Sequence, residues 1–179
     1  RFRNVTGVQT CALPIFVHGN NKSDDELAAA ARIGALVCLD SLEEIERAAA
    51  AGVTRTLVRF TPGIEANTHE AIRTAHHGSK FGLPAHDLIE AIRRARTIEG
   101  LHVHVGSQLF DLDAALEAVA WLATVAGTAH RETGWQPRTV DLGGGLGVRT
   151  SSDDPTLSID AFVRSEEHTS ELQSRFGIS

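Results

Sequence analysis

Lysine is scarce in this chain of 179 residues: Lys22 and Lys80 are the only two among 17 basic side chains, and the others are arginines. The net charge of −6, without a basic patch interleaved with aromatic residues, argues against a nucleic-acid surface. No apolar run approaches the roughly 20 residues that span a bilayer, and the first residues lack the order of a signal peptide. Cys11 and Cys38 show neither metal nor disulfide spacing. We therefore expect a cytoplasmic protein that binds neither membrane nor nucleic acid.

The two ends of the chain are related at the level of DNA. Residues 5–15 (VTGVQTCALPI) and 164–174 (RSEEHTSELQS) can be encoded by DNA words that are nearly reverse complements of each other. That word resembles a sequencing adapter, so these segments carry no information about the fold. The expectation is that 1–16 and 164–179 are non-native, pack poorly and add no strand, while 17–163 form a partial barrel domain interrupted at both ends.

Within this central part, helical and strand-like segments alternate. Acidic starts, apolar faces and closing glycines predict helices over 24–34, 41–52, 84–96 and 111–134. The Ser-x-x-Glu spacing of Ser41 and Glu44 predicts a capping box. Short apolar runs predict buried strands over 35–40, 55–60, 100–105 and 138–142, with the end of a fifth at 16–20.

This alternation predicts a parallel α/β protein, either a doubly wound sheet or a barrel. Polar or glycine-rich residues follow strand after strand. Because the carboxyl ends of parallel strands lie at one edge, we expect the chemistry on that rim.

Three successive glycines, Gly143, Gly144 and Gly145, follow the last strand. They can bring backbone N–H groups close to one anion at a strand-to-helix turn, as phosphate sites do. A flexible turn is the alternative. Asp141 two positions earlier, and the place after a late strand, favour phosphate binding.

His102 and His104 share one face of their strand with Gly106. Three interpretations compete. The histidines are hydrogen-bonded structural residues, or a His-x-His metal pair completed by residues such as His18 and Asp40. In the third, an imidazole packs flat against a planar cofactor while Ser107 donates to its phosphate.

Five motifs make the third interpretation specific: HGNNKS (18–23), RFTPGIEANTHE (59–70), SKFG (79–82), GLHVHVGSQLFD (100–111) and VDLGGGLG (140–147). In this order and spacing they resemble the diaminopimelate branch of the barrel-fold, pyridoxal-phosphate-dependent amino-acid decarboxylases. The resemblance implies a partial (β/α)8 barrel of the alanine racemase/decarboxylase type. About five of eight β/α units would be present and the C-terminal β-domain missing. It also implies a homodimer of the full-length protein.

The resemblance implies these site roles. His104 stacks on the pyridine ring of pyridoxal 5'-phosphate. The phosphate is held by Ser107, Gly143, Gly144 and Gly145, and Arg59 reaches the cofactor region. Gln108 lies beside the amino-acid substrate, and Lys80 lies near the subunit interface. His102, Asp141 and Asn21 are supporting residues.

The departures from the family matter as well. The family's cofactor-bearing lysine has a context that neither Lys22 nor Lys80 shares, so no catalytic residue is assigned. The Glu-Pro-Gly stretch that keeps the pyridine nitrogen protonated is missing, and tyrosine is absent. The implied reaction converts meso-2,6-diaminopimelate to L-lysine and carbon dioxide, and we expect the chain alone to be inactive. Alternatives are another basic-amino-acid decarboxylase, a non-catalytic pyridoxal-phosphate-binding barrel and a metal-dependent barrel hydrolase.

Overall fold

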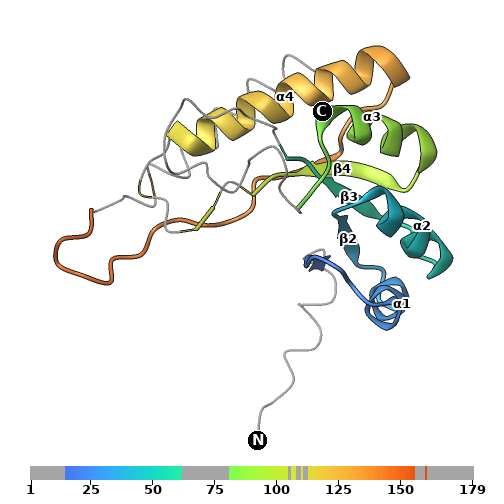
Figure 1. Ribbon diagram of the computed structural model, residues 1–179, viewed down its shortest axis with the longest axis horizontal. Helices are drawn as coiled ribbons and strands as arrows, with labels where there is room; N and C mark the ends of the chain where they lie inside the picture. The colour runs from blue at the N-terminus through green and yellow to red at the C-terminus, as the bar shows by residue number, and fades with distance from the viewer. Residues whose placement is uncertain are drawn as a thin grey trace, which may run out of the picture.

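The computed structural model describes residues 15–61, 81–104, 106–107, 110, 113–155 and 160. Its centre is a parallel sheet in the order β1-β2-β3-β4-β5, with the strands Phe16–Val17, Leu36–Leu39, Thr56–Arg59, Ile98–His102 and Thr139–Asp141. The helices are α1 (Asp24–Arg32), α2 (Leu42–Ala50), α3 (Ala85–Arg94) and α4 (Asp113–Thr133), and they lie on the outer side of the sheet (Figure 1). Each strand pairs with the next in sequence, which confirms the predicted parallel α/β class.

The sheet is curved, as the contact between its two edge strands at one end shows. His18, which follows β1, has its Nε2 atom 3.2 Å from Oδ2 of Asp141, at the end of β5. In a flat sheet four strand spacings would separate these strands by about 19 Å. An imidazole and a carboxylate cannot span that distance. The curvature resolves the choice left open by the alternation, and the fold is the predicted partial barrel of five strands.

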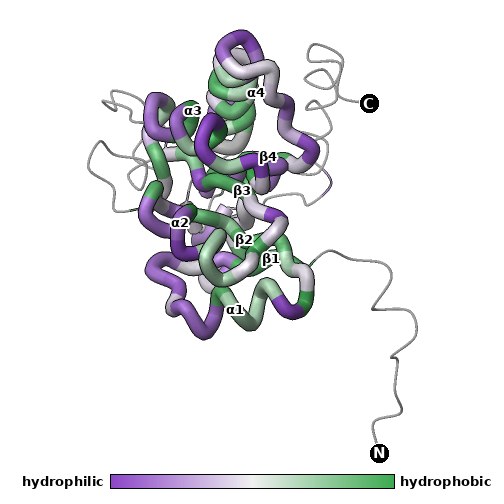
Figure 2. The backbone as a smooth tube through the Cα atoms, turned by 90° about the vertical axis from the view of Figure 1, so that its right-hand side faces the viewer, coloured by the Kyte–Doolittle hydropathy of each residue, from purple (hydrophilic) through white to green (hydrophobic). Residues whose placement is uncertain are grey.

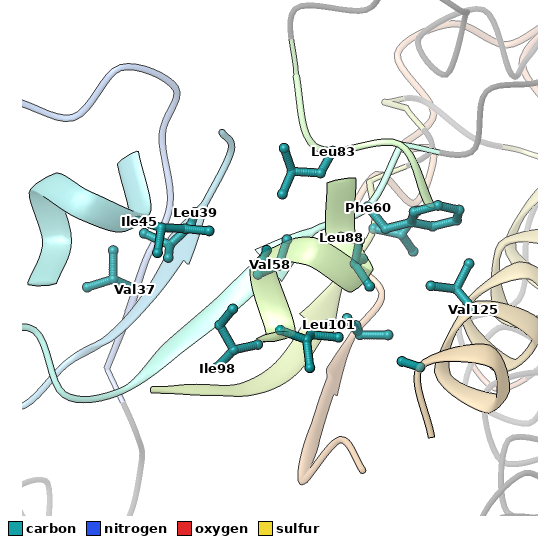
Figure 3. Close-up of a cluster of buried hydrophobic side chains, with 14 of the residues drawn as sticks. Val37, Leu39, Ile45, Val58, Phe60, Leu83, Leu88, Ile98, Leu101 and Val125 are labelled. Atoms are coloured by element: carbon teal, nitrogen blue, oxygen red, sulfur yellow. The ribbon is translucent and has the colours of Figure 1, made fainter. Parts of the chain in front are cut away.

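Alternate strand residues face opposite sides of the curved sheet. The outward-facing residues Val37, Leu39, Val58 and Leu101 pack with helix residues such as Ile45 and Leu88 in one core (Figure 3). Figure 2 shows these strands as hydrophobic, whereas the helices carry hydrophilic turns away from the sheet. The intervening residues Leu36, Cys38 and Leu57 form a separate small cluster on the inner face. The inner face therefore leads toward the polar rim.

The strand β4 begins and ends earlier than predicted. It spans Ile98–His102 in place of 100–105, so His104 lies beyond the strand. Gly100 stands in mid-strand, where a Cβ atom would overlap the Thr139 carbonyl oxygen and lie 2.6 Å from the Leu57 side chain. The missing side chain lets β3, β4 and β5 approach closely.

The predicted capping box at α2 forms only in part. Ser41 Oγ accepts a hydrogen bond from Glu44 N at 3.1 Å, but Glu44 Oε2 accepts from the amide of Asp40, outside the helix. A complete capping box stands instead at α1, between Ser23 and Glu26. The Glu44 side chain therefore does not cap the helix and instead accepts hydrogen bonds from Asp40 N and Lys22 Nζ.

It remains a prediction that the terminal segments are non-native and pack poorly, because residues 1–14 and 161–179 lie outside the described residues. Phe16, grouped above with the first segment, lies in β1, and Ile15 O accepts a hydrogen bond from Leu36 N at 2.8 Å. Both Ile15 and Phe16 are exposed. Backbone pairing of this kind needs no particular side chain, so it does not test the origin of the segment. Among the described helices, none is long and apolar enough to cross a membrane.

Candidate functional site

Each of the five strands ends at or just before a polar side chain. These residues are His18, Asp40, Arg59, His102 and Asp141. Because all five strands are parallel, the five side chains lie at one end of the half-barrel, which we call the rim. This is the end at which barrel proteins carry their chemistry.

Asp141 links two histidines across the rim. Its Oδ2 atom lies 3.2 Å from His18 Nε2 and 3.3 Å from His102 Nδ1, and the two imidazole rings meet edge-on with centroids 4.7 Å apart. Burial alone would raise the pKa of Asp141. The hydrogen bond from His102 and the N–H of Gly143 outweigh burial and lower that pKa. Asp141 is therefore an ionised carboxylate that orients both rings.

His18 and His104 favour their neutral forms. Burial lowers the pKa of His18, and the neighbouring His102 lowers it further, against the attraction of Asp141. Burial also lowers the pKa of His104, with Arg59 as the next cause. Both rings thus offer an uncharged aromatic face and a free lone pair near neutral pH.

The glycine turn packs against His104. Gly143 has a φ of 72°, and its N–H donates to Asp141 Oδ1 at 2.8 Å. A Cβ atom there would lie 2.7 Å from His104 Nδ1 and 2.9 Å from the Val103 carbonyl oxygen, whereas at Gly144 it would meet nothing within 4 Å. Only glycine fits the first position, and open space adjoins the second. A turn held this close to an imidazole suits a ligand that combines an anionic group with a planar ring.

A buried ion cluster lies beside the rim on β2 and α2. The Lys22 side chain is almost fully buried, and its Nζ donates to Gly19 O at 2.6 Å and to Glu44 Oε2 at 3.0 Å. Asp40 lies 3.7 Å from Lys22 and 3.5 Å from Arg59. Burial raises the pKa of Asp40, against the attraction of both cations. Two cations and two carboxylates balance, so Lys22 is an engaged structural cation. The role of Glu44 in this cluster could not be predicted from the sequence, because the spacing of Glu44 from Ser41 indicated a cap.

Cys38 is a second residue that sequence reasoning missed. It is buried on the inner face of β2, and one potential ligand atom each from Cys38, His18 and His102 lies within 4.8 Å of the others. Burial raises the pKa of the thiol, and the charge of Asp40 adds to the effect. The alternation of LVCL could have placed Cys38 on the inner face. Its closeness to histidines of β4 and the β1 end depends on curvature, which no local pattern reports.

The predicted site residues are brought together only in part. His104 and Gly143 are adjacent, and Arg59 lies at the rim with its guanidinium carbon 5.0 Å above the Phe81 ring. Ser107 is exposed, and Asn21 is exposed with a φ of 59°. Gln108 and Lys80 lie outside the described residues. Of the metal ligands considered with His102, His18 is adjacent, whereas Asp40 belongs to the ion cluster.

The curved parallel sheet, its polar rim and the glycine turn define a class: a β/α barrel with a glycine turn at the carboxyl ends of its strands. Residues 2–176 match the family model described as "Pyridoxal-dependent decarboxylase, pyridoxal binding domain". The chain belongs to this family of pyridoxal-dependent decarboxylases.

Within this family, the chain is similar to proteins named diaminopimelate decarboxylase. The chain is 45% identical over 159 residues to the diaminopimelate decarboxylase of Mycobacterium tuberculosis H37Rv, covering 79% of this chain and 36% of the relative. It is 33% identical over 178 residues to the Bacillus subtilis enzyme of that name, covering 91% and 40%. The crystal structure of diaminopimelate decarboxylase from Helicobacter pylori, complexed with L-lysine, matches with a TM-score of 0.73 at 26% identity, over 88% of this chain and 42% of that one. The chain therefore spans well under half the length of the proteins it matches.

Proposed function

We propose that this chain is part of a diaminopimelate decarboxylase, which converts meso-2,6-diaminopimelate to L-lysine and carbon dioxide with pyridoxal 5'-phosphate. The observation that carries the proposal is the packing of Gly143 against His104, which joins an anion-binding turn to a ring-stacking imidazole. The names of the relatives support the substrate, as does the L-lysine complex of the Helicobacter pylori structure.

The chain's own residues suit this cofactor. The turn Gly143–Gly145 would hold the phosphate through the N–H groups of Gly144 and Gly145, because that of Gly143 is donated to Asp141. The hydroxyl of Ser107 would add to this site, and His104 would lie against the pyridine ring. Arg59 would reach the cofactor region, Gln108 would contact the substrate, and Lys80 would lie near the interface of a homodimer. When bound, the cofactor supplies the electron sink for loss of carbon dioxide.

The rim residues would position these groups. Asp141 fixes the glycine turn through the Gly143 N–H and orients His102 through Nδ1. The lowered pKa of His104 keeps its imidazole uncharged, so the ring can stack without adding a positive charge. Asp40 holds the Arg59 guanidinium at the end of β3. The protein's part is thus preorganisation of phosphate and ring.

We further propose that the chain on its own does not decarboxylate diaminopimelate. Lys22 is buried between carboxylates, so its amine is not presented to a cofactor on the rim. The experiment combines the 179-residue chain, pyridoxal phosphate and meso-diaminopimelate and follows released carbon dioxide. The expected rate equals that of the free cofactor. Faster turnover that is abolished by Lys22→Arg or Lys80→Arg would contradict this proposal.

The phosphate site has a separate test with a matched control. Gly143 and Gly134 have nearly the same φ, 72° and 74°, but a Cβ atom at Gly134, beyond α4, meets nothing within 4 Å. Equilibrium dialysis of pyridoxal phosphate should show affinity reduced about tenfold or more in Gly143→Ala, about 1.4 kcal/mol, and little changed in Gly134→Ala. Equal affinities of the two variants would refute the assignment of the turn.

A further inference from the structure

We propose that His18, Cys38 and His102 form a binding site for a borderline-soft divalent cation of the zinc class, on the inner face below the rim. Each residue offers a ligand atom, and these three atoms lie within 4.8 Å of one another. Cys38 and His102 are 2% and 4% exposed, respectively, whereas the His18 side chain is 42% exposed. The site is therefore enclosed on two sides and reachable from the third.

The spacing is close to what a metal requires. Zinc bonds of 2.0–2.3 Å in a tetrahedron place nitrogen and sulfur ligands roughly 3.3–3.6 Å apart. The three side chains would need to close by about 1 Å, which is within the reach of small χ rotations. The ligands come from the ends of β1 and β4 and from β2, and the curvature of the sheet brings them together.

Asp141 supplies the outer support that metal-binding histidines usually have. It contacts Nε2 of His18 and Nδ1 of His102, which leaves one nitrogen available on each ring. A carboxylate behind an imidazole fixes the ring and strengthens it as a ligand. On binding, the Cys38 thiol would release its proton to solvent. The thiolate and the Asp141 carboxylate would then balance the two charges of the cation.

The donor set selects the class of metal. One thiolate and two imidazoles suit zinc and similar borderline-soft ions, whereas magnesium and calcium prefer oxygen ligands. Three protein ligands leave a fourth position for water or a small anion. The set includes neither His104 nor a glycine of the turn, and Asp141 contacts both the two histidine ligands and the Gly143 N–H.

Titration of the 179-residue chain with cobalt(II) tests this site without any cofactor. Cobalt(II) should bind one equivalent with a thiolate-to-cobalt charge-transfer band, release protons and be displaced by zinc. Cys38→Ala should abolish the band. Cys11→Ala removes the other thiol of the chain and should leave the band unchanged. Absence of the band in the original chain, or its loss in Cys11→Ala with retention in Cys38→Ala, would overturn the proposal.

The histidine ligands provide a second readout that does not depend on Cys38. His18→Asn should weaken cobalt binding at least tenfold, and Asp141→Asn should weaken it about 10- to 100-fold by removing the support of both rings. His130→Asn, at an exposed position of α4, is the matched control and should bind as the original chain does. Circular dichroism verifies that each variant is folded. If Cys38→Ala does not fold, unchanged affinity in His18→Asn would still refute the site.

Discussion

At the scale of single residues, we expect Lys22 to contribute strongly to the stability of the fold. It is 4% exposed and lies between Glu44 and Asp40, both also buried. Removing one partner from a buried ion cluster leaves the remaining charges without compensation, which costs about 3–5 kcal/mol. We expect Lys22→Met to lower the free energy of unfolding by that amount in urea denaturation.

An exposed ion pair provides the control for Lys22. Arg94 Nε lies 2.9 Å from Glu90 Oε1 one turn away on α3, and both side chains are about half exposed. Pairs of this kind contribute about 0.3–0.5 kcal/mol. Arg94→Met should therefore change stability little. Similar losses in the two variants would show that the Lys22 cluster is not energetically special.

The rim histidines predict a pH dependence of stability. The pKa values of His18 and His104 lie below the ordinary 6.5 in the folded chain, so protonation favours the unfolded state. Their contribution is complete above pH 6.5 and is lost as the pH falls through the lowered values. We expect the unfolding free energy to decline below that pH, with a shallower decline in the His18→Asn/His104→Asn double variant.

Two comparisons make the pH experiment specific. His130→Asn removes an exposed histidine of α4 and should leave the profile unchanged. Asp141 acts in another range: because its pKa is lowered in the fold, its contribution is present above about pH 3.9 and is lost at lower pH. A double variant with the original slope just below pH 6.5 would contradict the role given to His18 and His104.

The sequence predicted part of this site and not the rest. The glycine run and the motifs around His104 indicated residues that the structure brings together, because strand ends in a parallel fold share one rim. Glu44 and Cys38 could not be assigned. Lys22, the partner of Glu44, lies in the connection that follows β1, and His102, near Cys38, lies two strands away on β4. Neither contact leaves a signal in the local sequence pattern.

At the scale of elements, the pairing of β4 with β5 depends on Gly100. Any side chain there would overlap the backbone oxygen of Thr139, which cannot move without breaking the pairing. Overpacking usually costs about 1–3 kcal/mol. We expect Gly100→Ala to lose at least that much stability in chemical denaturation.

Gly144→Ala is the control for Gly100, since a Cβ atom at Gly144 meets nothing within 4 Å. It should change the unfolding free energy by no more than about 0.5 kcal/mol. An unchanged stability in Gly100→Ala would mean that β4 and β5 are not held at the distance described here.

Element types were more predictable than element boundaries. The four helices and five strands whose bounds are given above, all within the part of the chain that the structure describes, were predicted, because helical and strand periodicities differ and glycines close the helices. The predicted start of β4 was two residues late and the predicted end three residues late. The strand's apolar run continues through Val103, but its pairing with β5 ends at His102, where Asp141 stands opposite. Pairing is a property of two strands, so one strand's pattern cannot fix it.

At the scale of the whole molecule, the half-barrel has two edge strands among its described residues, β1 and β5. Strand edges present unpaired backbone groups and can template association with another chain. On β5 the apolar Val140 is 48% exposed, which adds hydrophobic surface to that edge. We therefore expect the chain to associate with increasing concentration.

A charge on the β5 edge should oppose this association. Natural proteins protect strand edges with lysines, because pairing would bury the ammonium group. Val140→Lys should shift the onset of association, measured by sedimentation velocity and light scattering, to several-fold higher protein concentration. Ile33→Lys is the matched control, since Ile33 is 60% exposed at the end of α1 and lies outside the sheet. If the two variants raise the onset equally, association depends on net charge or general surface hydrophobicity, and the edge of β5 is not its cause.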